Sequence, residues 1–177
     1  MDLISSCVMQ LKEAYGFLEA TMADVTPEVA NFVAPGRANS VGACYAHVIC
    51  GEDLALNGML KGGAPLFVSS HLGRIGVSEP MPMPGPTWVD YFPWTRRVKV
   101  DLQKLRAFAK EVEAASEKYV AGLKPQDLDR QIDLSGAGLG MRTVAWVLSR
   151  AVIAHADNLT GEISAIKGIQ GKKGYPA

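Results

Sequence analysis

Four segments of the sequence carry apolar side chains at every third or fourth position, which is the spacing of one face of an α-helix. They cover residues 2–24, 39–61, 102–122 and 143–168. Ser40 stands at the start of the second segment, where its hydroxyl suits a helix N-cap. No run of alternating apolar and polar residues indicates a strand. The pattern therefore predicts an all-α fold in which the long helices form a four-helix bundle.

The connection between the second and third predicted helices has a different character. Residues 62–93 hold six prolines and five glycines, and a long segment of this kind is unusual in a compact domain and often functional. The end of this crossover is rich in large aromatic side chains, namely Trp88, Tyr91, Phe92 and Trp94. We favour the reading in which these rings fasten the crossover to the bundle. A lid, or a surface for a partner in assembly or regulation, is the alternative.

Composition narrows the class of protein. The 177 residues suffice for a single domain, residues 1–177, and the 18 basic and 18 acidic side chains cancel, which disfavours nucleic-acid binding. No apolar run reaches the roughly 18 residues of a membrane span, and the N-terminus lacks the basic start of a secretory signal. Three cysteines form no disulfide framework. These features predict a soluble cytoplasmic protein without a nucleic-acid or membrane partner.

Two histidines occupy the middle of predicted helices. His47 lies in the second helix and His155 in the fourth, each on the face expected to point inward. Two imidazoles from facing helices are a common way to hold a divalent metal ion in a bundle. They are also compatible with buried neutral histidines that are hydrogen-bonded to neighbours, and the residues alone favour this second reading.

A third metal ligand is not evident from the spacing. One turn after His155 stands Leu159, which cannot coordinate a metal, and Glu162 lies two turns away, roughly 10 Å along the axis. Cys44 and Cys50 end about 120° apart around the second helix and cannot clasp one ion. We expect both to act as small buried hydrophobic residues. The candidates for lining a pocket are therefore His47, Cys50, His155, Leu159 and Glu162.

We assign no function to the remaining polar features of the sequence. The glycine-rich residues 136–140 precede the fourth helix without the strand or the Lys-Ser/Thr pair of a phosphate-binding loop, so we expect a flexible loop. His71 falls in the crossover, and the sequence shows no acid or oxyanion hole placed around it. Glu113 and Glu117 lie off the apolar face of the third helix and indicate ordinary surface charge.

Several motifs together point to a family. Residues 155–163 begin with His155 and end with Gly161, Glu162 and Ile163, and residues 39–52 combine an Asn-Ser pair with Ala46-His47 and Glu52. These motifs, with residues 124–129 and 143–146, resemble the DinB-like bundle family. That family typically ends its fourth helix with His, three residues, His, one residue, Gly, then Glu or Gln and an apolar residue. The resemblance covers most of the chain, and the crossover is its least similar part.

The resemblance implies an up-down-down-up four-helix bundle, often dimeric, with a divalent-metal site at its centre. Relatives include thiol-cofactor-dependent transferases and a maleylpyruvate isomerase that uses mycothiol, in which the metal would favour the nucleophilic thiolate. His47 and His155 match two of the family's metal ligands, and the third ligand position falls on Leu159. Many members of the family have no established activity, and the lost ligand places this chain nearer to them.

Two functions remain open at this point. We favour a DinB-like protein that binds a small molecule or a partner in a central cavity between the second and fourth helices, with a degenerate metal site at His47, His155 and Leu159. The alternative is a divalent-metal-dependent transferase or hydrolase that is linked to a thiol cofactor and acts on a small molecule. In that case His47 and His155 hold a nickel, zinc or manganese ion, and water or Glu162 completes its shell. We expect a homodimer in either case.

Overall fold

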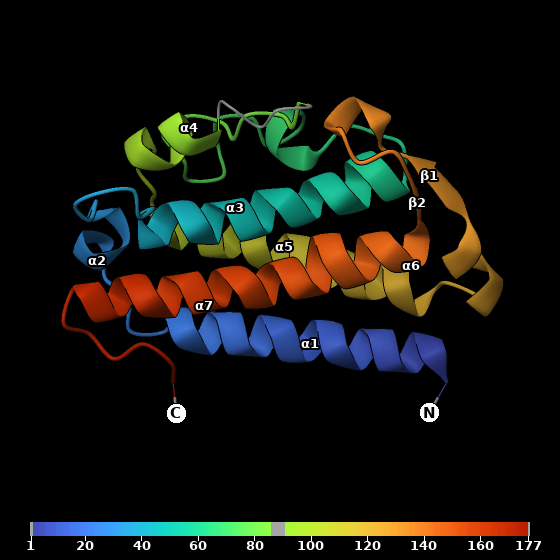
Figure 1. Ribbon diagram of the computed structural model, residues 1–177, viewed down its shortest axis with the longest axis horizontal. Coiled ribbons are helices and arrows are strands. Elements are labelled where there is room, and N and C mark those ends of the chain that lie inside the picture. The colour runs from blue at the N-terminus through green and yellow to red at the C-terminus, as the bar shows by residue number, and fades with distance from the viewer. Residues whose placement is uncertain (1, 86–90, 177) are drawn as a thin grey trace.

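The computed structural model describes residues 2–85 and 91–176, and most of them are helical (Figure 1). The long helices are α1 (Leu3–Met22), α3 (Val41–Asp53), α5 (Leu102–Ala121) and α7 (Ala154–Ile169). Shorter helices lie between them, namely α2 (Pro27–Asn31), α4 (Tyr91–Arg97) and α6 (Val144–Trp146). The predicted dominance of helix is confirmed. Within the described ranges, no helix is long and apolar enough to cross a membrane.

A π-helix extends both α3 and α7. η1 (Leu54–Leu60) continues α3, and η5 (Val147–Ile153) joins α6 to α7. The two π-helices contact each other. The second and fourth predicted helices therefore have the expected extent, but each changes its winding part-way along. Winding of this kind is rare and is frequently found at functional sites.

Side-chain caps fix where the helices begin. At the start of α3, the hydroxyl of Ser40 accepts a hydrogen bond from the backbone N–H of Ala43 at 3.1 Å, as the sequence predicts. Thr143 caps α6 and Asp101 caps α5 in the same way. These caps satisfy N–H groups that have no partner within the helix.

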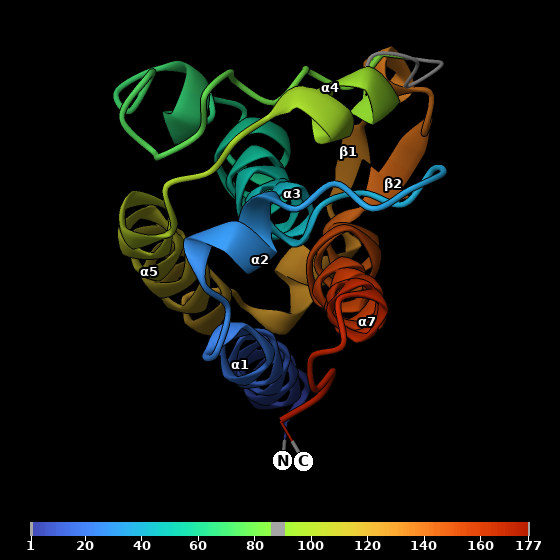
Figure 2. The same ribbon diagram turned by 90° about the vertical axis from the view of Figure 1, so that its left-hand side faces the viewer.

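Seen end-on, α1, α3, α5 and α7 stand at four corners (Figure 2). α3 packs against α5 and α7, and α1 packs against the same two helices. α3 is strongly enclosed, because from Val41 to Cys50 only the side chain of His47 keeps partial exposure. Gly42 lets α2 approach closely, since a Cβ atom at this position would lie 2.9 Å from the carbonyl oxygen of Ala30. The most buried helix of the four is thus the one that carries His47.

The described part of the crossover lies across α3. The short helices η2 (Leu66–Val68) and α4 contact α3, and the buried carboxylate of Asp53 accepts the backbone N–H of Phe67 at 2.9 Å. Trp94 has no exposed surface, and its indole N–H donates to a carbonyl oxygen of the crossover at 3.2 Å. Trp94 therefore fastens the crossover to the helices. Trp88 lies outside the described residues.

A short β-hairpin precedes the last helical segment, although the sequence has no alternating run that indicates a strand. β1 (Gln131–Asp133) and β2 (Met141–Thr143) pair antiparallel. The glycine-rich stretch between them forms the turn, in which Gly138 and Gly140 adopt φ angles of 74° and 67°. Such left-handed angles favour glycine. Each strand has three residues, which is too short to show alternation in the sequence.

Candidate functional site

His47 and His155 lie side by side although they are far apart in the sequence. Their ring centroids are 4.6 Å apart, and the rings meet edge to face at 78°. The helices that carry them, α3 and α7, pack along each other (Figure 2). Gly51 permits this approach, because a Cβ atom there would lie 3.2 Å from Cε1 of His155. The structure thus brings together the two imidazoles that the sequence singles out.

Burial keeps both imidazoles neutral. It lowers the pKa of His47 well below the ordinary value of 6.5, and the neighbouring His155 lowers it further. Burial also lowers the pKa of His155. At pH 7 each ring therefore presents one N–H donor and one nitrogen lone pair.

Tyr91, the first residue of α4, stands against His47. Its hydroxyl is hydrogen-bonded to Nδ1 of His47, and the two ring centroids are 4.1 Å apart. Burial, followed by the neighbouring Cys44 and Glu162, raises the pKa of the Tyr91 phenol, which stays protonated at neutral pH. The sequence groups Tyr91 with the other crossover aromatics. It contains no signal that this ring reaches a histidine 44 positions earlier in the chain.

Glu162 lies further along α7 and adds a carboxylate to the group. Its Oε1 accepts a hydrogen bond from Nδ2 of Asn39 at 2.6 Å. The same carboxylate lies against the thiol of Cys44, whose pKa is raised well above its usual range by burial and then by Glu162. Asn39 directly precedes the cap of α3, so the Asn-Ser pair read as a cap signal also provides a partner for Glu162.

The remaining pocket candidates do not complete a metal shell. Leu159 is 8% exposed and belongs to the hydrophobic core. Cys50 is fully buried, and burial, aided by Asp53, raises the pKa of its thiol and disfavours the reactive thiolate. Over residues 2–85 and 91–176, no three or more His, Cys, Asp or Glu side chains are arranged to hold a metal ion. The residues described do not match the three-ligand site that the family resemblance implies.

A second polar cluster lies in the core between α1, α3 and α5, and the sequence reading missed it. The hydroxyl of Tyr15 donates to Oε1 of Glu52, which is 2% exposed. Oε2 of Glu52, Oε1 of Glu113 and the hydroxyl of Ser116 are buried without a hydrogen-bond partner in the described structure. Burial raises the pKa of Glu52 to about 7 and that of Glu113 to about 8, the latter with help from Glu19. The expectation that Glu113 is ordinary surface charge is therefore wrong.

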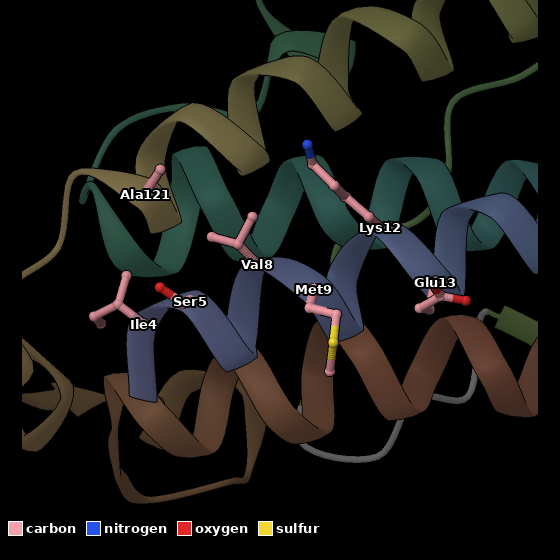
Figure 3. Close-up of a pocket in the computed structure, with 7 residues that line it drawn as sticks. All are labelled: Ile4, Ser5, Val8, Met9, Lys12, Glu13 and Ala121. Carbon is pink, nitrogen blue, oxygen red and sulfur yellow. The ribbon is translucent and has the colours of Figure 1, made fainter. Parts of the chain in front are cut away.

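A surface groove lies elsewhere, over the start of α1 and the end of α5 (Figure 3). It has a volume of about 480 Å³ and is lined by Ile4, Ser5, Val8, Met9, Lys12, Glu13 and Ala121. Neither His47 nor His155 lines it. Lys12 forms an ion pair with Glu117 at 3.2 Å, so the positive charge of Lys12 at the groove already has a partner in this chain.

A model of one protein family matches most of the chain. The model of the DinB superfamily matches residues 10–158. The chain belongs to the DinB superfamily. This DinB-superfamily chain is also similar to a solved structure described as that of the conserved protein of locus from Enterococcus faecalis, with a TM-score of 0.79. The two share 23% identity over 97% of this chain and 99% of that chain, a likeness that shows the fold; no curated protein matches the sequence.

Proposed function

We propose that this DinB-superfamily protein binds a small molecule between α3 and α7, and that it does so without a resident metal ion. One observation carries the proposal. The neutral imidazoles of His47 and His155 lie 4.6 Å apart, while apolar Leu159 stands where the family's third ligand is expected. Tyr91 is hydrogen-bonded to His47, and Glu162 lies near Tyr91. A few convergent polar groups among apolar side chains are typical of a small-molecule site.

The proposal includes the finer architecture expected of the family. The long helical segments form an up-down-down-up four-helix bundle, residues 62–93 are its crossover, and a central cavity between α3 and α7 holds the ligand. The protein acts as a cytoplasmic homodimer and has no nucleic-acid or membrane partner. The enclosure of α3 by its neighbours supports a site in the interior rather than on an outer face.

The experiment that tests this function is elemental analysis combined with native mass spectrometry. Protein purified without a histidine tag should contain no stoichiometric nickel, zinc or manganese, and should carry or bind an organic molecule of low mass. His47→Ala should abolish that binding. His71→Ala is the matched control, because His71 lies in the crossover and pairs with Glu111 rather than with the imidazole pair.

The alternative function is that of a divalent-metal-dependent, thiol-cofactor-linked transferase or hydrolase. It is favoured by the close approach of two neutral imidazoles, since metal binding requires the unprotonated ring. The same measurement separates the two functions. One metal ion per chain, lost in His47→Ala and retained in His71→Ala, would establish the metal site and refute the metal-free proposal.

A further inference from the structure

The hydroxyl of Tyr91 has a proton, and its surroundings determine where that proton points. Cys44 and Glu162 lie near it, but Glu162 is hydrogen-bonded to Asn39, and within the described part of the chain Tyr91 bonds only to Nδ1 of His47. A phenol is protonated at neutral pH, because its ordinary pKa is about 10. Since Nδ1 is the only acceptor that the described residues place on this hydroxyl, its proton has a partner only when Tyr91 donates to Nδ1.

α4 is held firmly enough to fix the hydroxyl in place. Trp94, one turn after Tyr91, has no exposed surface, and neither has Thr95. Nη1 of Arg96 donates to the carbonyl oxygens of Ala34 at 3.0 Å and Ala38 at 2.5 Å, which ties α4 to the segment that leads into α3. Tyr91 is thus a fixed part of the wall around His47.

The two ring nitrogens of His47 face different surroundings. Nδ1 is bonded to the Tyr91 hydroxyl. The opposite edge of the ring faces Gly51, because Cδ2 of His47 lies 3.8 Å from a Cβ atom placed there. Nε2, which is bonded to Cδ2, is therefore the nitrogen left for a ligand.

We infer that Tyr91 is a positioning residue that holds His47 in the tautomer with hydrogen on Nε2, so that the site offers its ligand a donor. A neutral imidazole whose Nδ1 accepts a hydrogen bond carries its proton on Nε2. That nitrogen has no lone pair for a metal ion, and it recognises an oxygen acceptor such as a carbonyl or hydroxyl group. This inference rests on the proposed metal-free binding function and gives it a cause, because Tyr91 opposes metal binding at His47.

The first test measures the tautomer of His47 directly. Two-dimensional ¹⁵N–¹H correlation spectra distinguish Nδ1–H from Nε2–H rings, and the chain has three histidines to assign, with His71→Ala and His155→Gln as aids. The wild-type protein should show His47 with hydrogen on Nε2 at pH 7.5. Tyr91→Phe keeps the ring and removes the hydroxyl, so it should shift His47 toward a mixture of tautomers. Hydrogen on Nδ1 in the wild-type protein overturns the inference.

The second test uses Zn²⁺ alone as the probe. Titration calorimetry at pH 7.5 should show at least tenfold tighter Zn²⁺ binding to Tyr91→Phe than to the wild-type protein, and no such gain in Tyr175→Phe, whose ring is exposed. Circular dichroism confirms that both variants are folded. Equal Zn²⁺ affinity in all three proteins overturns the role of Tyr91. Stoichiometric metal in freshly purified wild-type protein instead refutes the proposed function itself, so the two failures are distinguishable.

Discussion

Replacing Glu52 by glutamine should make the protein more stable at pH 8, with a much smaller gain at pH 5. Glu52 is 2% exposed, its Oε1 accepts from Tyr15, and its Oε2 has no partner among the described residues. An ionised carboxylate in such a place is costly because its charge is removed from water. Glutamine has nearly the same shape without the charge, keeps an oxygen for Tyr15, and offers its amide hydrogens to Ser116 and Glu113, which also lack partners.

The magnitude follows from the pKa of this carboxyl group. Burial raises it from the ordinary value of 4.5 to about 7, and Asp53 and Glu117 also raise it, while the hydrogen bond from Tyr15 lowers it. At roughly 1.4 kcal/mol per pH unit, this difference corresponds to about 3 kcal/mol of unfolding free energy. Because the folded-state pKa lies above the unfolded value, the stability that the protonated Glu52 carboxyl group provides is fully present below pH 4.5. It is lost as the pH rises through 7.

The assay is urea unfolding of the wild-type protein and Glu52→Gln at pH 5, 6, 7 and 8. The free energy of unfolding of the variant should exceed that of the wild-type protein by an amount that grows with pH and reaches about 2–3 kcal/mol at pH 8. Glu13→Gln, an exposed change on α1, is the control and should show no such trend. A difference between Glu52→Gln and the wild-type protein that stays constant from pH 5 to 8 would refute the reasoning. So would a variant that is less stable at pH 8.

Three further results are expected. Lys167→Met should lower the unfolding free energy by about 1–3 kcal/mol in urea, because the buried ammonium donates to Asp24 and to a carbonyl oxygen of α1, both at 2.6 Å. Gly42→Ala should lower the melting temperature by several degrees in calorimetry, since its Cβ atom would lie within 3 Å of a carbonyl oxygen of α2. The ring-proton shifts of His47 and His155 should change less in NMR spectra between pH 8 and 6.5 than those of a free histidine with a pKa of about 6.5, because burial lowers both pKa values.

Much of the helical framework could be predicted from local sequence. The apolar spacing and the cap at Ser40 locate the start of α3, because a helix forms its contacts within one turn of itself. The winding within a helix could not be predicted in this way. Nothing in the composition of η1 or η5 separates them from α-helix, and both lie where the two helical segments contact each other.

The candidate site, like the fold, could be predicted only where local sequence determines it. The positions of His47 and His155 on helix faces could be read from spacing, and so could the apolar residue at position 159. Tyr91 and Asn39 could not, because each acts on a residue that is brought close only by the packing of distant segments. A buried glutamate such as Glu52 is also invisible to spacing. Its neighbours Tyr15 and Ser116 come from two other helices.

The π-helical turns of η1 and η5 bear on how this family tolerates changes in length. Each hydrogen-bonded ring of a π-helix encloses one residue more than the corresponding ring of an α-helix. η5 therefore contains more residues than an α-helix would need to span the same distance. Loss of one residue within it can be absorbed by rewinding to α-helix, with the flanking segments still facing as before. The same deletion between Ser40 and His47, where the winding is already α-helical, would turn the imidazole by about 100° around the axis. Natural length variation among relatives should therefore accumulate in the π-helices.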